Sequence, residues 1–312
     1  MKKIIFMGTP DFAVPVLEQL ISEEYTIDLV VTQPDRPRGR KKVMTPPPVK
    51  VAAEKHHIPV FQPEKIKDDY EEIKKRKPDL IVTAAFGQLL PKGLLDIPSF
   101  GCVNVHASLL PKLRGGAPIH YSILEGHEQT GISIMYMAEK LDAGDVISQE
   151  AVTIEDADDV ASLHDKLSKV GAELLSATLP AIFTGEAGRT PQDDNEATFA
   201  PNIKREQEQI DWNRSQQFIY NHIRGLHPWP VAFTTWQGKV LKVYQASKVD
   251  TVTDAVPGEV IELNDTGVVV ATADNKAIQL MTVQPAGKKK MQAADFLRGV
   301  GSNMTVGEKL GE

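Results

Sequence analysis

The stretch GCVNVHASLLPKLRGGAPIH, residues 101–120, decides the fold of this chain and lies at the centre of its chemistry. It begins with Val103 and Val105, an apolar, β-branched run that predicts a short buried strand. Asn104 and His106 are set into that run with a spacing of two. Because side chains alternate across a strand, this spacing puts the amide and the imidazole on one face, about 7 Å apart along the chain.

This pair of polar groups precedes a loop rich in residues that break regular structure, namely Pro111, Gly115, Gly116 and Pro118. Either polar residue alone is most simply a hydrogen-bonding partner in a core. The two together, at the end of a buried strand, are the groups that acyl-type transfer needs. The amide can stabilise an oxyanion and the ring can move a proton.

The segments on either side of this stretch alternate between strand and helix patterns. Buried-strand patterns occur at residues 3–8, 27–33, 79–85, 102–107 and 131–137, with helical stretches between most of them. This alternation predicts an α/β fold with a doubly wound, mostly parallel sheet, Rossmann-like in class. Ligands of such sheets bind beyond the carboxyl ends of the strands, where His106 is expected.

The turn after the first strand argues against a dinucleotide cofactor. It reads Gly8-Thr9-Pro10-Asp11, without the G-x-G-x-x-G pattern that brings backbone amides close to a pyrophosphate. Pro10 removes an amide donor and Asp11 adds the wrong charge. We therefore expect no NAD(P).

A second domain follows a polar stretch at residues 185–209, which reads as a linker. Beyond it, five short β runs predict a small, OB-like β-barrel. These runs are residues 232–236, 239–246, 258–263, 267–272 and 277–283. The predicted bounds are 1–188 for the first domain, 189–208 for the linker and 209–312 for the second domain.

Composition limits the remaining choices. The 312 residues carry a net charge of −7, so the molecule as a whole is not a general nucleic-acid binder. One cysteine suits a reducing compartment, and the N-terminal apolar run is too short for a signal peptide, so we expect a cytoplasmic protein without a membrane span. Cys102 lies four residues from His106, about 13 Å in extended chain, which excludes a Cys–His nucleophile. No histidine or cysteine spacing predicts a metal site.

Several motifs together resemble one family of enzymes. The run NVHASLLPKLRG resembles the signature of folate-dependent formyltransferases. Five further stretches resemble the methionyl-tRNA formyltransferases within that family: MGTPDFAVPVL, QPDRPRGRKK, AAFGQLLP, LDAGDV and IRGLHPWPVAF. The resemblance extends from residue 1 to about residue 300. It implies transfer of a formyl group from 10-formyltetrahydrofolate, as co-substrate, to the α-amino group of initiator methionyl-tRNA.

The resemblance also implies site residues. Asp142, in the LDAGD motif, corresponds to the third catalytic residue of the family beside Asn104 and His106, and a carboxylate there would hold the ring in one orientation. His106 would either stabilise the oxyanion or shuttle the amine proton. Two segments are implied to bind the folate: Phe86, Gln88, Leu89, Leu90 and Pro91, and Ser108, Leu109, Leu110 and Pro111.

A basic segment stands out in this acidic chain. Arg36, Arg38, Arg40, Lys41 and Lys42 are five cations within seven residues, broken by a proline and a glycine. This composition predicts an exposed, mobile loop, and such charge runs are usually solvated surface. In the family that the chain resembles, the matching loop reaches the acceptor end of the tRNA, and we expect the same role here.

Two other functions stay open at this point. One is the same chemistry on a small amine, either glycinamide ribonucleotide or an amino sugar, which would need neither the basic segment nor the second domain. The other is a non-catalytic RNA-binding protein built on the barrel. We expect a monomer.

Overall fold

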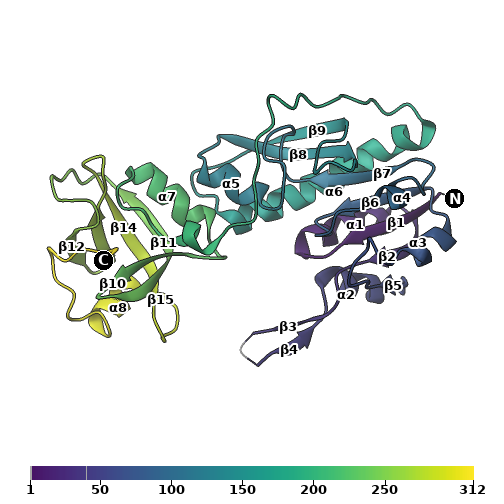
Figure 1. Ribbon diagram of the computed structural model, residues 1–312. Helices are drawn as coiled ribbons and strands as arrows, with labels where there is room; N and C mark the ends of the chain where they lie inside the picture. Colours follow the sequence, from purple (N-terminus) through teal and green to yellow (C-terminus); the bar gives the residue numbers. More distant parts are fainter. Residues whose placement is uncertain (1, 40) are drawn as a thin grey trace. The chain divides into compact units, whose positions relative to one another are not determined.

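The computed structural model describes residues 2–39 and 41–312, which form two compact units (Figure 1). Unit 1 comprises the chain up to Pro118 together with Gln129–Thr153 and His164–Pro201. Unit 2 comprises Ile119–Glu128, Ile154–Leu163 and Asn202–Glu312. The domain bounds expected from the sequence stay predictions, since a compact unit need not fold by itself.

Unit 1 is built on a seven-stranded sheet with the order β5-β2-β1-β6-β7-β8-β9. The first five strands of that order pair in parallel, whereas β8 is antiparallel to β7 and β9 is antiparallel to β8. The predicted mostly parallel, Rossmann-like sheet is confirmed. The strands are β1 (Lys3–Gly8), β2 (Thr26–Val31), β5 (Val60–Phe61), β6 (Leu80–Ala84), β7 (Cys102–His106), β8 (Gln129–Tyr136) and β9 (Val146–Thr153).

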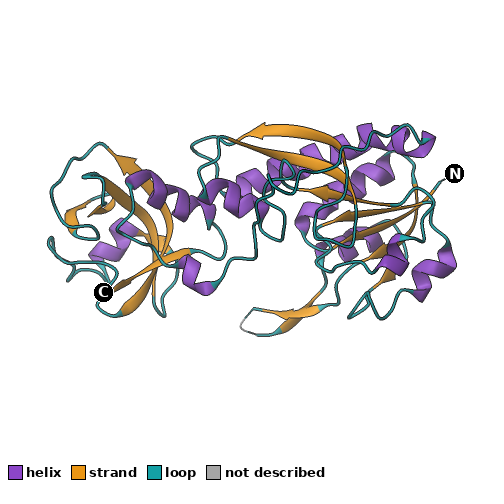
Figure 2. Cartoon of the chain, turned by 45° about the horizontal axis from the view of Figure 1, so that its top comes forward, coloured by secondary structure: helices purple, strands orange, loops and turns teal. Residues whose placement is uncertain are grey.

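Helices cover both faces of this sheet (Figure 2). Ile5 and Met7 of β1 pack in one cluster with Ile73 of α3 and Leu94 of α4. On the other face, α6 comes so close to β7 that a Cβ added at Gly171 would lie 2.9 Å from Val105. The helices of unit 1 are α1 (Val14–Ser22), α2 (Pro48–Lys55), α3 (Glu71–Arg76), α4 (Lys92–Leu95) and α6 (Val160–Thr184) from His164 onward, with the 3₁₀ turn η1 (Asp11–Ala13). Apart from Pro118, α5 (Pro118–Leu124) belongs to unit 2.

The strand order reverses between β1 and β6, because β2 and β5 lie on one side of β1 and β6 to β9 lie on the other. Hydrogen bonds join the loops at the carboxyl ends of the central strands. Thr9 Oγ1 and Gln33 Nε2 both donate to the carbonyl of Phe86, at 3.0 and 3.2 Å. Such a switch point is where doubly wound sheets bind ligands.

The basic segment is a hairpin, and the prediction of a loop there was wrong. β3 (Arg36–Arg38) pairs antiparallel with β4 (Val43–Thr45). Three-residue strands are too short to show an apolar periodicity, and an edge ribbon tolerates Pro37. The base is anchored by Asp35, whose pKa is lowered by hydrogen bonds from Gln62 and Lys50.

Unit 2 is built on an antiparallel sheet with the order β10-β11-β14-β13-β12, in which β15 also pairs with β14. All five predicted β runs are strands, and the two-residue β15 is a sixth strand that was not predicted. The elements are β10 (Ala232–Trp236), β11 (Lys239–Val249), β12 (Val260–Asn264), β13 (Gly267–Ala271), β14 (Ala277–Pro285) and β15 (Met291–Gln292), with α7 (Gln216–Gly225), α8 (Ala293–Arg298) and the 3₁₀ turn η2 (Arg205–Glu208).

Part of the polar stretch expected to be a linker, residues 190–200, pairs with other segments of unit 1, and we call it the strap. Thr190 and Val146 exchange backbone hydrogen bonds at 2.9 Å. Further along, the Arg114 amide donates to Thr198 O at 2.9 Å and the Ala200 amide donates to Arg114 O at 2.8 Å. Polar composition concealed this pairing, because the strap is held by backbone bonds and not by apolar burial.

Within residues 2–39 and 41–312, no helix is long and apolar enough to span a bilayer.

Candidate active site

Strand β7 carries the two central polar residues between two neighbouring strands. Asn104 is in register with Thr83 of parallel β6 and with Met135 of antiparallel β8. His106 is the last residue of β7 and pairs with Ser133 of β8. The structure therefore puts both residues on one strand, at the carboxyl end of the parallel part of the sheet.

The amide of Asn104 is oriented by a hydroxyl group. Asn104 Oδ1 accepts a hydrogen bond from Thr83 Oγ1 at 2.8 Å. The side chain is half-buried, and no other described residue accepts a hydrogen bond from its Nδ2. With its oxygen engaged, the amide offers its NH₂ group as a fixed donor, which is what an oxyanion requires.

The ring of His106 is buried, with 5% of its surface exposed, and both of its nitrogens face oxygen atoms. Nε2 donates to the carbonyl of Leu113 at 3.1 Å, because a carbonyl can only accept. Nδ1 lies 3.8 Å from Asp142 Oδ2. A ring that takes up a proton at Nδ1 therefore gains an ion pair inside the site.

Asp142 lies in the turn between β8 and β9. Its backbone has φ +47°, a left-handed conformation that a short Asp side chain tolerates. Its Oδ2 accepts from the Gly115 amide at 2.9 Å, which ties the turn to the loop after β7. Gly144 completes the turn, since a Cβ there would lie 1.9 Å from Tyr136 O.

The loop after β7 is fixed by Ser133 and Gln149. Ser133 Oγ donates to Ser108 O at 2.6 Å and accepts from the Leu110 amide at 3.1 Å. Gln149 Nε2 donates to Leu110 O at 3.0 Å. Ser108 itself is fully buried and the Leu110–Pro111 peptide is cis. Ser108, Leu109, Leu110 and Pro111 are thus held beside His106, and their contact with folate stays a prediction.

The other segment predicted to bind folate is split between core and surface. Phe86 and Leu90 pack in the apolar cluster under β1 and β6, whereas the Leu89 side chain is 63% exposed. Gln88 Oε1 accepts from the Ile66 amide at 2.8 Å, and Pro91 is half-buried before α4. The side chains of Phe86 and Leu90 therefore pack in the core of unit 1. Their contact with folate stays a prediction.

Four of the five predicted tRNA-binding cations belong to the hairpin. Arg36 Nη2 pairs with Glu64 Oε2 at 2.6 Å, and Lys41 and Lys42 are exposed beyond the strands. The backbone of Arg38 is part of β3. Arg40 lies outside the described residues.

Cys102 begins β7 but packs in the core. Burial, with a smaller contribution from Asp96, raises the pKa of its thiol to about 12. A thiol in that environment stays protonated at neutral pH and cannot act as a nucleophile. The described residues contain no group of three or more His, Cys, Asp and Glu side chains that could hold a metal ion.

Three residues that sequence reasoning missed surround the Asp142 turn. Arg114 is 1% exposed, and its guanidinium contacts Gln192 and Asp194 of the strap. Hydrogen bonds from Lys140 and from Arg114 lower the pKa of Asp194. Arg114 stands in the opening stretch of the sequence, but its partners lie about eighty positions further along the chain, beyond the reach of any local pattern.

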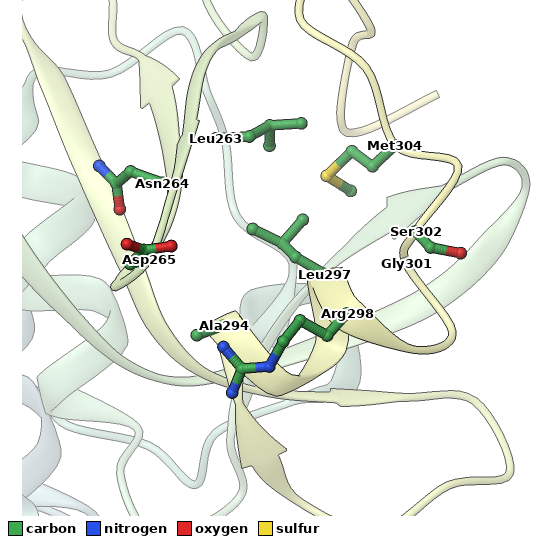
Figure 3. A pocket seen from close by; sticks show the side chains of 9 residues that line it. All are labelled: Leu263, Asn264, Asp265, Ala294, Leu297, Arg298, Gly301, Ser302 and Met304. Atoms are coloured by element: carbon green, nitrogen blue, oxygen red, sulfur yellow. The ribbon is translucent and has the colours of Figure 1, made fainter.

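A separate cavity of about 270 Å³ lies in unit 2, between the end of β12 and the segment that follows α8 (Figure 3). Asp265 and Arg298 are among its lining residues. The groups suited to acyl transfer are all in unit 1, so polar geometry and not cavity size identifies the candidate active site.

Comparison with known proteins agrees with this chemistry. Residues 1–179 match the family described as "Formyl transferase", and residues 202–301 match "Formyl transferase, C-terminal domain". The chain is 60% identical to the methionyl-tRNA formyltransferase of Geobacillus sp. (strain WCH70), covering 100% of this chain and 99% of that one. It is 61% identical to the one from Halalkalibacterium halodurans, with 99% and 98% covered.

Solved structures share the fold at lower identity. The N-formyltransferase from Helicobacter canadensis, in complex with folinic acid and dTDP-3-aminofucose, matches with a TM-score of 0.70 at 17% identity, covering 91% of this chain and 100% of that chain. HypX from Aquifex aeolicus, in complex with tetrahydrofolic acid, matches with a TM-score of 0.65 at 18% identity over 95% of this chain. The chain spans about half the length of HypX, 47% in that structure. Two matched domains and full-length relatives at this level of identity show that the chain belongs to the formyltransferase family.

Proposed function

We propose that this formyltransferase transfers the formyl group of 10-formyltetrahydrofolate to the α-amino group of initiator methionyl-tRNA, for translation initiation. The observation that carries the proposal is identity of about 60% to methionyl-tRNA formyltransferases over the full chain. The site geometry supports it, because an oriented amide donor and an imidazole paired with a carboxylate stand at the ligand-binding edge of the sheet.

The reaction begins with attack of the neutral amine on the formyl carbon. A C–N bond forms and the formyl oxygen becomes an oxyanion, which accepts a hydrogen bond from Asn104 Nδ2. The pair formed by His106 and Asp142 takes up the proton that the amine nitrogen loses. The oxyanion then re-forms the carbonyl as the bond between the formyl carbon and N10 of the folate breaks, N10 takes the proton held by the pair of His106 and Asp142, and tetrahydrofolate leaves.

The charged groups support a large, anionic acceptor. Lys41 and Lys42 are exposed on the β3–β4 hairpin, where phosphates can reach them. A small amine would not need this hairpin. We place the enzyme in the cytoplasm, where charged tRNA is used, and we propose that it acts as a monomer.

The test is formyl transfer from 10-formyltetrahydrofolate to methionyl-tRNA, compared with transfer to glycinamide ribonucleotide and to a nucleotide-linked amino sugar. We expect kcat/KM to be higher by orders of magnitude with charged initiator tRNA. Preference for either small amine would contradict the proposal. RNA binding without any formyl transfer would indicate a binding protein.

A further inference from the structure

The strap carries a glutamine that joins two parts of the active site. Gln192 Nε2 donates to Asp142 O at 2.9 Å and to Gly144 O at 2.7 Å. Both carbonyls belong to the turn that presents the Asp142 carboxylate. One side-chain amide thus uses both of its hydrogens to fix the backbone of a turn about fifty residues away in the sequence.

Arg114 determines which way this amide points. Its Nε and Nη2 both donate to Gln192 Oε1, at 3.0 and 2.8 Å, and its Nη1 pairs with Asp194 Oδ1 at 2.8 Å. A flipped amide would set its NH₂ group against the guanidinium donors and its oxygen against the two carbonyls. Because guanidinium has no acceptor atom, only the observed orientation satisfies every group.

Gly115, the residue after Arg114, contacts the Asp142 side chain. The Gly115 amide, next in sequence, donates to Asp142 Oδ2, the oxygen that lies 3.8 Å from His106 Nδ1. The backbone of the turn and its carboxylate are therefore both fixed from the segment 114–115. Buried hydrogen-bond networks of this kind keep reacting groups within the small tolerance that transfer chemistry allows.

We infer that Gln192 is a positioning residue for formyl transfer, which holds the Asp142 turn so that its carboxylate faces His106, with Arg114 fixing the Gln192 amide. The inference rests on the proposed function for its kinetic consequence. Its structural consequence, a rigid Asp142 turn, does not depend on which amine is the substrate.

Gln192→Glu tests this role with little change in shape. The carboxylate still accepts from Arg114 but has no hydrogen to donate to Asp142 O or Gly144 O. Asn195→Asp is the matched control, since it makes the same amide-to-carboxylate change within the strap, where Asn195 bonds to Asp193. Gln192→Met removes both sets of bonds at similar volume, without adding charge.

Steady-state formyl transfer should show a loss in kcat and not in binding. We expect kcat of Gln192→Glu to fall roughly 10- to 100-fold, as misplacement of a reacting group by about 1 Å can do, with KM for both substrates within about twofold. In an Asp142→Asn background, Gln192→Glu should lower kcat by less than about twofold. Substitutions of two residues that act through one another do not have additive effects. Equal losses in both backgrounds, or an equal loss in Asn195→Asp, would overturn the inference.

Hydrogen exchange of the substrate-free protein separates this inference from the proposed function. We expect faster amide exchange in residues 142–146 of Gln192→Glu and Gln192→Met, and unchanged exchange there in Asn195→Asp. Unchanged exchange in the Gln192 variants would overturn the positioning role whatever the substrate. Faster exchange in the Gln192 variants of a protein that formylates no tRNA would support the positioning role of Gln192 and contradict the proposed function.

Discussion

Asn104 and His106 lie on one strand, and side chains from other parts of the chain contact both the amide and the imidazole. Asn104 and His106 could be predicted because a strand has a period of two, so position alone puts both on one face. Nothing local indicates that Thr83 orients the amide, or that Gln192 and Arg114 hold Asp142. Those contacts depend on strand order and on the path of the strap, which bring together residues between about twenty and eighty positions apart in the sequence.

At this scale the donor on Asn104 can be removed almost without changing shape. Asn104→Asp can still accept from Thr83 Oγ1 but offers no hydrogen to an oxyanion. We expect kcat for formyl transfer to fall about a hundred- to thousandfold, as loss of one oxyanion donor does, with little change in melting temperature. Thr83→Val, which leaves the amide in place but unoriented, should cost less. A folded Asn104→Ala protein with near-normal kcat would show that the amide has no role in turnover.

Among the elements, the regular ones were predictable and the β3–β4 hairpin and the strap were not. Strands β1, β2, β6, β7 and β8 each bury several apolar residues, and burial is what a sequence pattern reports. The hairpin and the strap are held by backbone hydrogen bonds and by ion pairs such as Arg36–Glu64. Most of their described side chains are exposed, Val43, Met44 and Phe199 among them, and neither segment has an apolar periodicity, so both resemble loops in sequence.

The hairpin gives a prediction about the acceptor substrate. In Lys41→Gln/Lys42→Gln we expect KM for methionyl-tRNA to rise and KM for 10-formyltetrahydrofolate to stay the same. The slope of log KM against log salt should fall by roughly one for each phosphate that the variant no longer neutralises. Lys74→Gln is the control, since Lys74 is an exposed lysine of α3 outside the hairpin that pairs with Glu71. Unchanged salt dependence in the double variant would remove the hairpin from tRNA binding.

For the whole molecule, alternation of strand and helix followed by five short β runs was enough to predict both architectures. The division into units was harder to predict, because Ile119–Glu128 and Ile154–Leu163 belong to unit 2 although they lie within the first domain by sequence. Ile154–Leu163 carries an acidic cluster, but such a cluster also suits the start of a helix and does not indicate a change of unit. Their assignment follows from packing, which a sequence pattern does not contain.

Unit 2 contains a buried histidine that links its stability to pH. His222 Nε2 donates to Gln207 O at 2.8 Å, and its buried Nδ1 has no hydrogen-bond partner among the described residues. Burial lowers the pKa of His222. Below about pH 6.5 the His222 ring is therefore protonated in the unfolded chain but stays neutral in the folded unit. The free energy of unfolding then falls as pH decreases through this range, by up to about 1.4 kcal/mol per pH unit.

His222→Gln should reduce this dependence, because a glutamine amide can still donate to Gln207 O but does not titrate. The measurement is urea unfolding between pH 7.5 and pH 5, followed by tryptophan fluorescence. All three tryptophans, Trp212, Trp229 and Trp236, belong to unit 2, so the signal reports its unfolding directly. Equal pH slopes in the variant and the unmodified protein would show that His222 is not the titrating group.

The buried thiol of Cys102 has a practical consequence for fluorescent labelling of the enzyme. It is the chain's single cysteine, and its pKa of about 12 keeps it inert toward maleimides at neutral pH. A second cysteine introduced at Met44, which is exposed on the hairpin, would therefore take up a dye selectively, without removal of the natural one. Fluorescence from that dye could follow the approach of a tRNA acceptor stem to the hairpin in real time.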